Sequence, residues 1–221
     1  MRSLLITLAF TSLLASATIA ADPPKQRTFT FENDAVGAPP ADFEFARTGR
    51  GAQGKWTVEL ERGGKDHVLL QSSADKTDDR FPVAVVKNES FHDVTLTVRA
   101  RPLAGVVDQG FGVVWRYRNA DNYYITRCNA LEDNCTIYHV INGRRQPFQN
   151  HSVKVASNAW HTLKMEARGN HFVVWFDGAK VLDARDDTFQ SGQVGLWTKA
   201  DSVIEFDDLT IAPQVVPPKI R

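Results

Sequence analysis

Polar side chains that could bind a ligand crowd into one 19-residue stretch of the chain, Arg116–Asn134. The stretch holds three arginines, three tyrosines, four asparagines and three acids, yet its pattern is that of a β-hairpin. Arginine, asparagine and tyrosine side chains are costly to bury without hydrogen-bond partners. These groups therefore either satisfy one another or contact a polar ligand.

Two cysteines indicate the register of this hairpin. Cys128 and Cys135 have six residues between them, so a turn around residues 131–132 places them opposite each other. A disulfide is expected if the protein reaches an oxidising compartment, and free thiols are the alternative. A metal site is not favoured, because two thiols lack third and fourth ligands at any usual spacing.

The same register gives the hairpin two different faces. The face with the cysteines looks like core, whereas the other face carries Tyr123, Arg127, Asn129 and Asn134. Guanidinium groups, amides and tyrosine hydroxyls match the hydroxyl groups of a saccharide. Two interpretations stay open: a saccharide-binding face, or an internal polar network that stabilises the sheet.

The rest of the chain has the pattern of an all-β protein. Short runs rich in Val, Ile, Thr and aromatic residues alternate with Gly, Pro, Asn and Asp, which predicts about thirteen β-strands. Residues 94–101 alternate apolar and polar side chains, as a half-buried antiparallel strand does. We predict one domain over residues 22–212, a two-sheet antiparallel jelly-roll sandwich.

The two ends of the chain are expected to lie outside this domain. Residues 1–21 combine Arg2, a short apolar run and an Ala-Ala end, which is typical of a signal peptide, with an uncleaved anchor as the alternative. We therefore expect an exported protein, periplasmic or extracellular, with no membrane insertion after cleavage. Residues 213–221 are expected to form a short extended tail.

The charge balance bears on possible partners. The chain has 26 basic and 26 acidic residues, interspersed along its length, and a formal net charge of zero. This pattern disfavours nucleic acid as a main partner. The oligomeric state is not indicated by the sequence.

Several motifs resemble one known family. The segments Gly112–Tyr124, Trp160–Leu163, Phe176–Gly178 and Gly195–Ser202 resemble concanavalin A-like, laminin-G-like jelly-roll domains. In particular, the chain resembles bacterial secreted proteins related to the 3-keto-disaccharide hydrolase domain, which is similar to family 16 glycoside hydrolases. The resemblance covers residues 28–212. It implies a concanavalin A-like sandwich but not an activity, because this fold hosts lectins, glycan-binding modules, hydrolases and lyases.

Further ligand-binding candidates lie near these motifs. Arg80, Arg116 and Lys199 could add polar contacts, and Trp197 could stack on the apolar face of a sugar. The competing expectation for Trp197 is burial in the core. A solvated loop is the alternative for Lys199.

The resemblance also implies a structural calcium ion between the first and last strands. Glu32 and Asp208 are the matching acids, and calcium prefers such hard oxygen ligands. Solvated turn acids are the alternative. The histidines show no spacing that favours zinc, and no cofactor is required.

An enzyme is the alternative to a saccharide-binding module. Family 16 hydrolases carry acids in the order Glu-x-Asp-x-Glu, and no such run exists here. Retaining hydrolysis needs two carboxyl groups about 5–5.5 Å apart, whereas adjacent acids point to opposite faces of a strand. A hydrolase or lyase acting on 3-keto-glycosides stays possible, with Glu132 or Asp201 as the base. A third interpretation is a structural envelope protein without a small ligand.

Overall fold

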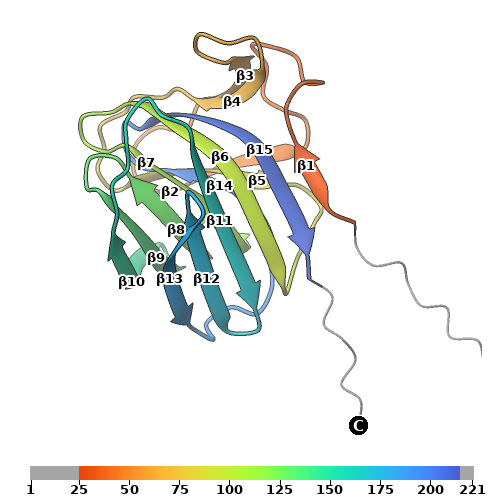
Figure 1. Cartoon of the computed structure of the whole chain (residues 1–221), viewed down its shortest axis with the longest axis vertical. Helices are drawn as coiled ribbons and strands as arrows, with labels where there is room; N and C mark the ends of the chain where they lie inside the picture. Colours follow the sequence, from red (N-terminus) through yellow and green to blue (C-terminus); the bar gives the residue numbers. More distant parts are fainter. Residues whose placement is uncertain (1–24, 215–221) are drawn as a thin grey trace, which may run out of the picture.

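The computed structural model describes residues 25–214, and these form fifteen β-strands and no helix. The strands form two antiparallel sheets stacked as a sandwich (Figure 1). This arrangement confirms the predicted all-β jelly-roll architecture. The predicted signal peptide, residues 1–21, lies outside the described residues, as do residues 215–221 of the predicted tail. No helix long and apolar enough to cross a membrane occurs between residues 25 and 214.

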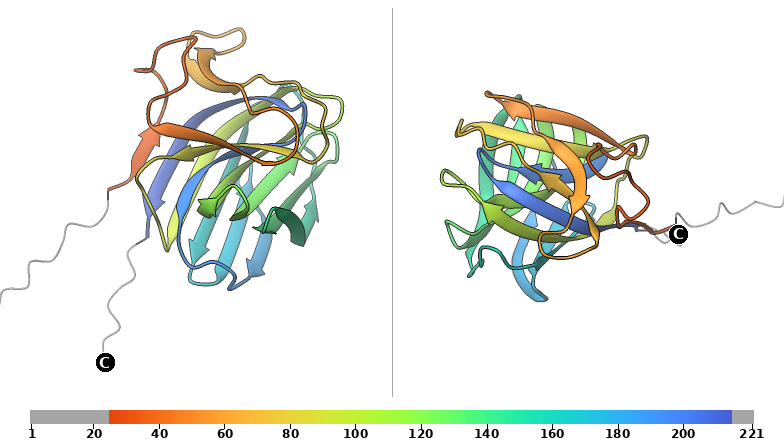
Figure 2. Two further views of the ribbon diagram at one scale, coloured as in Figure 1. Left: turned by 180° about the vertical axis from the view of Figure 1, so that it is seen from behind. Right: turned by 90° about the horizontal axis from the view of Figure 1, so that it is seen from above.

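The larger sheet has eight strands, and the last strand of the chain lies near its centre. The strand order is β13 (Ala179–Arg185), β12 (His171–Phe176), β11 (His161–Arg168), β6 (Val94–Ala104), β15 (Val203–Pro213), β4 (His67–Gln71) and β3 (Trp56–Leu60), with β1 (Arg27–Phe29) also paired to β15. The last strand therefore returns beside the first, as the sequence predicts (Figures 1 and 2).

The smaller sheet has seven strands and contains the polar hairpin. The strand order is β10 (Arg144–Ser152), β9 (Asn134–Ile141), β8 (Asn122–Asn129), β7 (Gly110–Asn119), β14 (Gln193–Thr198), β5 (Arg80–Val86) and β2 (Phe43–Gly49).

Two strands, β10 and β2, are not predicted from the sequence, and these are the two edges of the seven-stranded sheet. Strand β10 is mostly polar and exposed, and its ladder shifts register between Pro147 and Gln149. A proline is tolerated at such an edge, where its missing N–H faces no partner strand. Strand β2 is only partly buried and ends at Gly49. Edge strands bury too little to show the apolar pattern of central strands.

Apolar side chains cover both faces of the seven-stranded sheet. One face packs against the other sheet and forms the main core, which includes Trp115 and Tyr124. The opposite, outer face carries a second buried cluster. That cluster comprises Phe81, Val83, Val85, Val114, Tyr117, Tyr123, Ile125, Tyr138, Val140 and Trp197.

Candidate functional site

The β8–β9 hairpin has the register that its cysteines predict. Cys128 and Cys135 pair across the ladder and form a disulfide with their Cα atoms 4.1 Å apart. Both lie in the main core, and Asn129 lies opposite Asn134 on the other face. Asp133 closes the turn with a φ of 50°, a left-handed conformation in which aspartate is enriched. The hairpin therefore presents a polar edge beside the outer apolar cluster.

Six polar side chains gather at this edge, on the outer face of the seven-stranded sheet. They come from β8, from the β8–β9 turn, from the start of β9 and from the loops that adjoin β7 and β14. We call them the polar cluster: Asp108, Arg127, Asn129, Glu132, Asn134 and Lys199.

Arg127 is the centre of one half of the polar cluster. Its guanidinium donates to Oδ1 of Asn134, to Oε2 of Glu132 at 2.7 Å and to the Tyr138 hydroxyl at 3.0 Å. The Arg127 side chain is only 5% exposed, whereas that of Glu132 is 42% exposed. Burial favours a higher pKa for Glu132, but the charge of Arg127 outweighs burial and lowers the pKa. The Glu132 carboxylate is therefore held ionised at the surface, and its Oε1 accepts no hydrogen bond from residues 25–214.

Asp108 is the centre of the other half. Its side chain is 1% exposed, and its carboxylate lies 2.9 Å from Nζ of Lys199 and accepts from the Asn129 amide at 2.9 Å. Burial raises the pKa of Asp108 in spite of the nearby ammonium. Lys199 also pairs with Asp78 at 2.6 Å. Burial favours a lower pKa for Lys199, but the two carboxylates outweigh burial, raise the pKa and keep the ammonium charged.

Asp201 positions the loop that carries Asp108. The Asp201 carboxylate accepts hydrogen bonds from the backbone amides of Val106, Val107 and Asp108, at 2.8 to 3.3 Å. Asp201 is only 3% exposed, and burial favours a higher pKa, but the three amides outweigh burial and lower the pKa of Asp201. Both carboxylate oxygens of Asp201 are thus engaged within the protein. This candidate base serves as a loop anchor, and we leave it out of the proposed catalytic groups.

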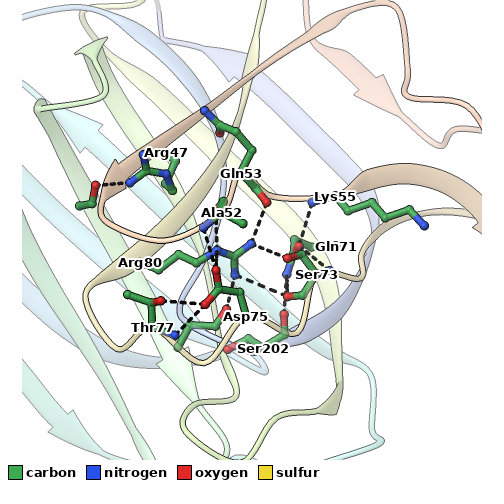
Figure 3. Close-up of polar contacts among 12 residues, drawn as sticks. Arg47, Ala52, Gln53, Lys55, Gln71, Ser73, Asp75, Thr77, Arg80 and Ser202 are labelled. Carbon is green, nitrogen blue, oxygen red and sulfur yellow. Dashed lines mark hydrogen bonds and ion pairs between the residues drawn. The ribbon is translucent and has the colours of Figure 1, made fainter.

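Arg80 holds the segment that carries Lys199. Its guanidinium is fully buried and donates to the carbonyls of Ala52 and Gln53, at 2.6 and 3.0 Å, and to the Ser73 hydroxyl at 2.7 Å (Figure 3). It also donates to the Ala200 carbonyl, while its own carbonyl accepts from the Ala200 amide. Arg80 therefore fixes the backbone beside Lys199 and has no free donor for a ligand.

Two glycines of β7 leave room for these side chains. Gly112 lies in register between Arg127 on β8 and Trp197 on β14. Gly110 is the next β7 residue on this face, and a Cβ there would lie 2.6 Å from Oδ1 of Asp108. Glycine in a strand often marks such a close approach. Side chains from the flanking strands therefore meet over β7.

Three other predicted ligand contacts are buried. Arg116 is 1% exposed and donates to the carbonyls of His92, Phe189 and Gly169, away from the polar cluster. Tyr123 is fully buried, which raises its pKa to about 12. Trp197 is also fully buried, as the alternative expectation of burial in the core predicts, and its ring stacks on that of Phe81 with the ring centres 5.5 Å apart. We leave these three side chains out of the proposed contact surface.

The acids of the predicted calcium site have protein partners. Oε1 of Glu32 accepts from the His67 amide at 2.9 Å, and Oδ2 of Asp208 accepts from Arg99 at 3.2 Å. Across residues 25–214, no three His, Cys, Asp or Glu side chains lie close enough together to hold a metal ion. Calcium at these positions would depend on carbonyl or water ligands, and it stays a prediction.

Comparison with known families decides the affiliation of the chain. Residues 47–212 match the sequence model of a family described as the 3-keto-alpha-glucoside-1,2-lyase-like domain. The chain belongs to this family. The match confirms the resemblance to 3-keto-disaccharide hydrolase-related proteins.

Relatives of this lyase-like domain include parts of longer proteins. The chain is 30% identical over 95 residues to a levanase of Bacillus subtilis (strain 168), and the match covers 42% of the chain and 14% of the levanase. The chain thus matches only a small part of that protein.

Solved structures share the fold of this lyase-like domain. The carbohydrate-binding module CBM66 from Bacillus subtilis has a TM-score of 0.59 and 22% identity, over 76% of this chain and 95% of the module. The exoplasmic/lumenal domain of VIP36, in a form bound to Ca²⁺ and mannose, has a TM-score of 0.60 and 9% identity, over 88% of this chain and 92% of that domain. At these identities the likeness establishes the jelly-roll fold alone.

Three side chains in or beside the polar cluster are not predicted from the sequence. Asp108 lies in a loop with no pattern of its own, and only the contact with the distant Asp201 brings it to Lys199. Arg145 lies on the unrecognised edge strand β10, where its guanidinium stacks 4.5 Å from the ring centre of Tyr138. The hairpin register already places Tyr138 on the polar face, but its hydroxyl is not recognised as a partner of an arginine.

Proposed function

We propose that this protein binds a saccharide at the polar cluster. The observation that carries the proposal is the proximity of an exposed carboxylate, Glu132, to the charged ammonium of Lys199, which helps to lower the pKa of that carboxylate. A sugar hydroxyl both donates and accepts, so neighbouring hydroxyls fit a carboxylate next to an ammonium. Oε1 of Glu132 is a free acceptor, and an ammonium with two carboxylate partners keeps one N–H for a ligand.

The two interpretations of the polar face apply to different side chains. Arg127 and Asn129 are buried and have partners within the protein, so they form the supporting network. Glu132 is 42% exposed and Lys199 is 12% exposed, so these two side chains reach the surface above that network. A site held in this way is preorganised, and ligand binding costs less side-chain entropy.

The comparisons support a saccharide as the ligand class. The family description names a glucoside, and the structural neighbours include a carbohydrate-binding module and a mannose-bound domain. Export of the protein belongs to the same proposal. The Cys128–Cys135 disulfide supports it, because disulfides persist in oxidising compartments.

Calorimetric titration with methyl α-D-glucopyranoside and its 3-keto derivative tests the proposal. Glu132→Gln keeps the shape of the side chain and removes its charge, so at least one glycoside should bind the wild type and bind this variant about tenfold more weakly. Asp42→Asn is the matched control, because Asp42 is an exposed carboxylate paired with Arg27 away from the cluster. Equal affinity of Glu132→Gln and wild type for every glycoside that binds would contradict the proposal.

A second candidate function is cleavage of a 3-keto-glycoside. It is favoured by one observation: the ionised carboxylate of Glu132, whose pKa is lowered, shares the cluster with the charged ammonium of Lys199, whose pKa is raised. Such separated pKa values suit an acid–base pair. Glu132 would take the proton from C2, the C–H electrons would form the C1–C2 double bond, and the C1–O bond would break. The Lys199 ammonium would protonate the leaving oxygen.

Methanol release from methyl 3-keto-α-D-glucopyranoside tests this second function. Release by the wild type, lost in Glu132→Gln, would support an enzyme. Binding without release would leave the protein as a saccharide-binding module.

A further inference from the structure

The outer face of the eight-stranded sheet contains a second, unassigned cavity. Its volume is about 320 Å³, and it is lined by Thr97, Thr162, Lys164, Trp175 and Gly178. Thr97 on β6, Lys164 on β11 and Trp175 on β12 pair in register and so form one row across three strands. Ligand pockets begin at about 300 Å³, so the cavity suits a ligand of one ring.

The polar groups of this cavity have no partners within the described part of the chain. Neither the hydroxyls of Thr97 and Thr162 nor the indole N–H of Trp175 makes a hydrogen bond there, and Lys164 makes no ion pair. Nζ of Lys164 lies 4.5 Å from the ring centre of Trp175. The cavity thus joins an aromatic ring to four unpaired polar groups.

Two other cations on the same sheet have ion-pair partners. Lys180 contacts Asp183 at 3.0 Å, and Arg168 contacts Glu166 at 2.8 Å. Lys164 is therefore a cation that the surrounding surface leaves unpaired. An unpaired cation with adjacent hydroxyls favours a ligand that is rich in acceptor oxygens.

A second tryptophan on this face, Trp160, has partners within the protein for both its N–H and its ring. The Trp160 N–H donates to Glu61 at 2.8 Å, and Arg99 and Arg101 lie 4.6 and 4.9 Å from its ring centre. Trp175 is half-buried like Trp160 but has only the flexible Lys164 over its ring. The face of the Trp175 ring can therefore be uncovered by one lysine rotamer change.

We infer that this cavity is a second saccharide-binding site. A pyranose ring would lie with its apolar C–H face on the Trp175 indole, and its oxygens would accept from Lys164 and exchange hydrogen bonds with Thr97 and Thr162. The ring meets an aromatic surface and its hydroxyls meet donors, which is the combination that a sugar requires. This site is on the opposite sheet from the polar cluster and does not depend on it.

The indole N–H resonances of the tryptophans test this inference. Trp175→Phe and Trp160→Phe assign the two signals in ¹H–¹⁵N spectra of the purified protein. Titration with methyl β-D-glucopyranoside and with methyl β-D-glucuronide should shift the Trp175 signal saturably at millimolar concentration with at least one of them. The Trp160 signal should stay in place.

Two further variants make the result specific. Lys164→Ala removes a partly exposed ammonium that makes no ion pair within the described residues, so folding is not at risk, and binding of the effective sugar should weaken about tenfold. Glu132→Gln should leave the Trp175 shift unchanged, which separates this site from the polar cluster. A Trp175 signal that does not saturate with either sugar, or that shifts equally in Lys164→Ala, would overturn the inference.

Discussion

Replacing Arg127 with alanine should destabilise the protein because its guanidinium is a buried support of the polar cluster. The change removes hydrogen bonds to Asn134, Glu132 and the Tyr138 hydroxyl. Loss of the hydrogen bonds to the two neutral partners costs about 1 kcal/mol each, and more where a buried group is left without its donor. The ion pair adds roughly 0.5–1 kcal/mol, because Glu132 is 42% exposed and well solvated. We expect a total loss of about 2–4 kcal/mol.

Urea unfolding followed by tryptophan fluorescence measures this loss directly. In a domain of this size, the expected loss corresponds to a melting-temperature decrease of roughly 4–16 °C. Arg127→Lys should recover only part of it, because lysine keeps the charge but lacks the planar fork. Arg144→Ala is the control, since Arg144 is an exposed arginine on β10 and should change stability by less than about 0.5 kcal/mol. Equal stabilities of Arg127→Ala and Arg144→Ala would refute the supporting role.

Three further predictions concern stability. Burial raises the pKa of Asp207 to about 6, so the folded state holds this proton more tightly and the protein loses stability as pH rises from about 4 to about 6. Asp207→Asn should therefore be more stable than wild type by about 1–3 kcal/mol at pH 7 and equally stable below pH 4. A stability difference that does not depend on pH would contradict this. Reducing the Cys128–Cys135 disulfide should cost about 2–3 kcal/mol in the chain-entropy model, and an unchanged urea midpoint with reductant would count against it. If Glu32 and Asp208 hold calcium, chelator should lower the melting temperature and calcium should restore it, whereas one melting curve under both conditions would remove the site.

The sequence predicts the central strands and the hairpin register well. The spacing of Cys128 and Cys135 around a turn specifies every cross-strand pair of the hairpin, because side chains alternate with a period of two. The edge strands β2 and β10 are missed because edges carry exposed polar residues instead of an apolar alternation.

The site is less predictable because its parts are distant in sequence. Asp108 and Lys199 are 91 positions apart, and their pairing depends on Asp201 and Arg80 holding two loops. No local pattern encodes such contacts. Trp175 is not predictable either: burial alternates along β12, but five of its six residues are apolar, so the sequence does not show that this indole lies on the outer face.

¹H–¹⁵N spectra of the wild-type protein locate the bound sugar on the molecule. The titrant is whichever of methyl α-D-glucopyranoside and its 3-keto derivative binds in calorimetry. A saccharide at the polar cluster should shift the backbone amides of residues 129–134 and of Lys199 saturably, and in Glu132→Gln the same shifts should need about tenfold more sugar to saturate. Saturable shifts confined to other parts of the protein, or shifts at 129–134 that saturate at the same sugar concentration in Glu132→Gln and wild type, would contradict a saccharide site at the polar cluster.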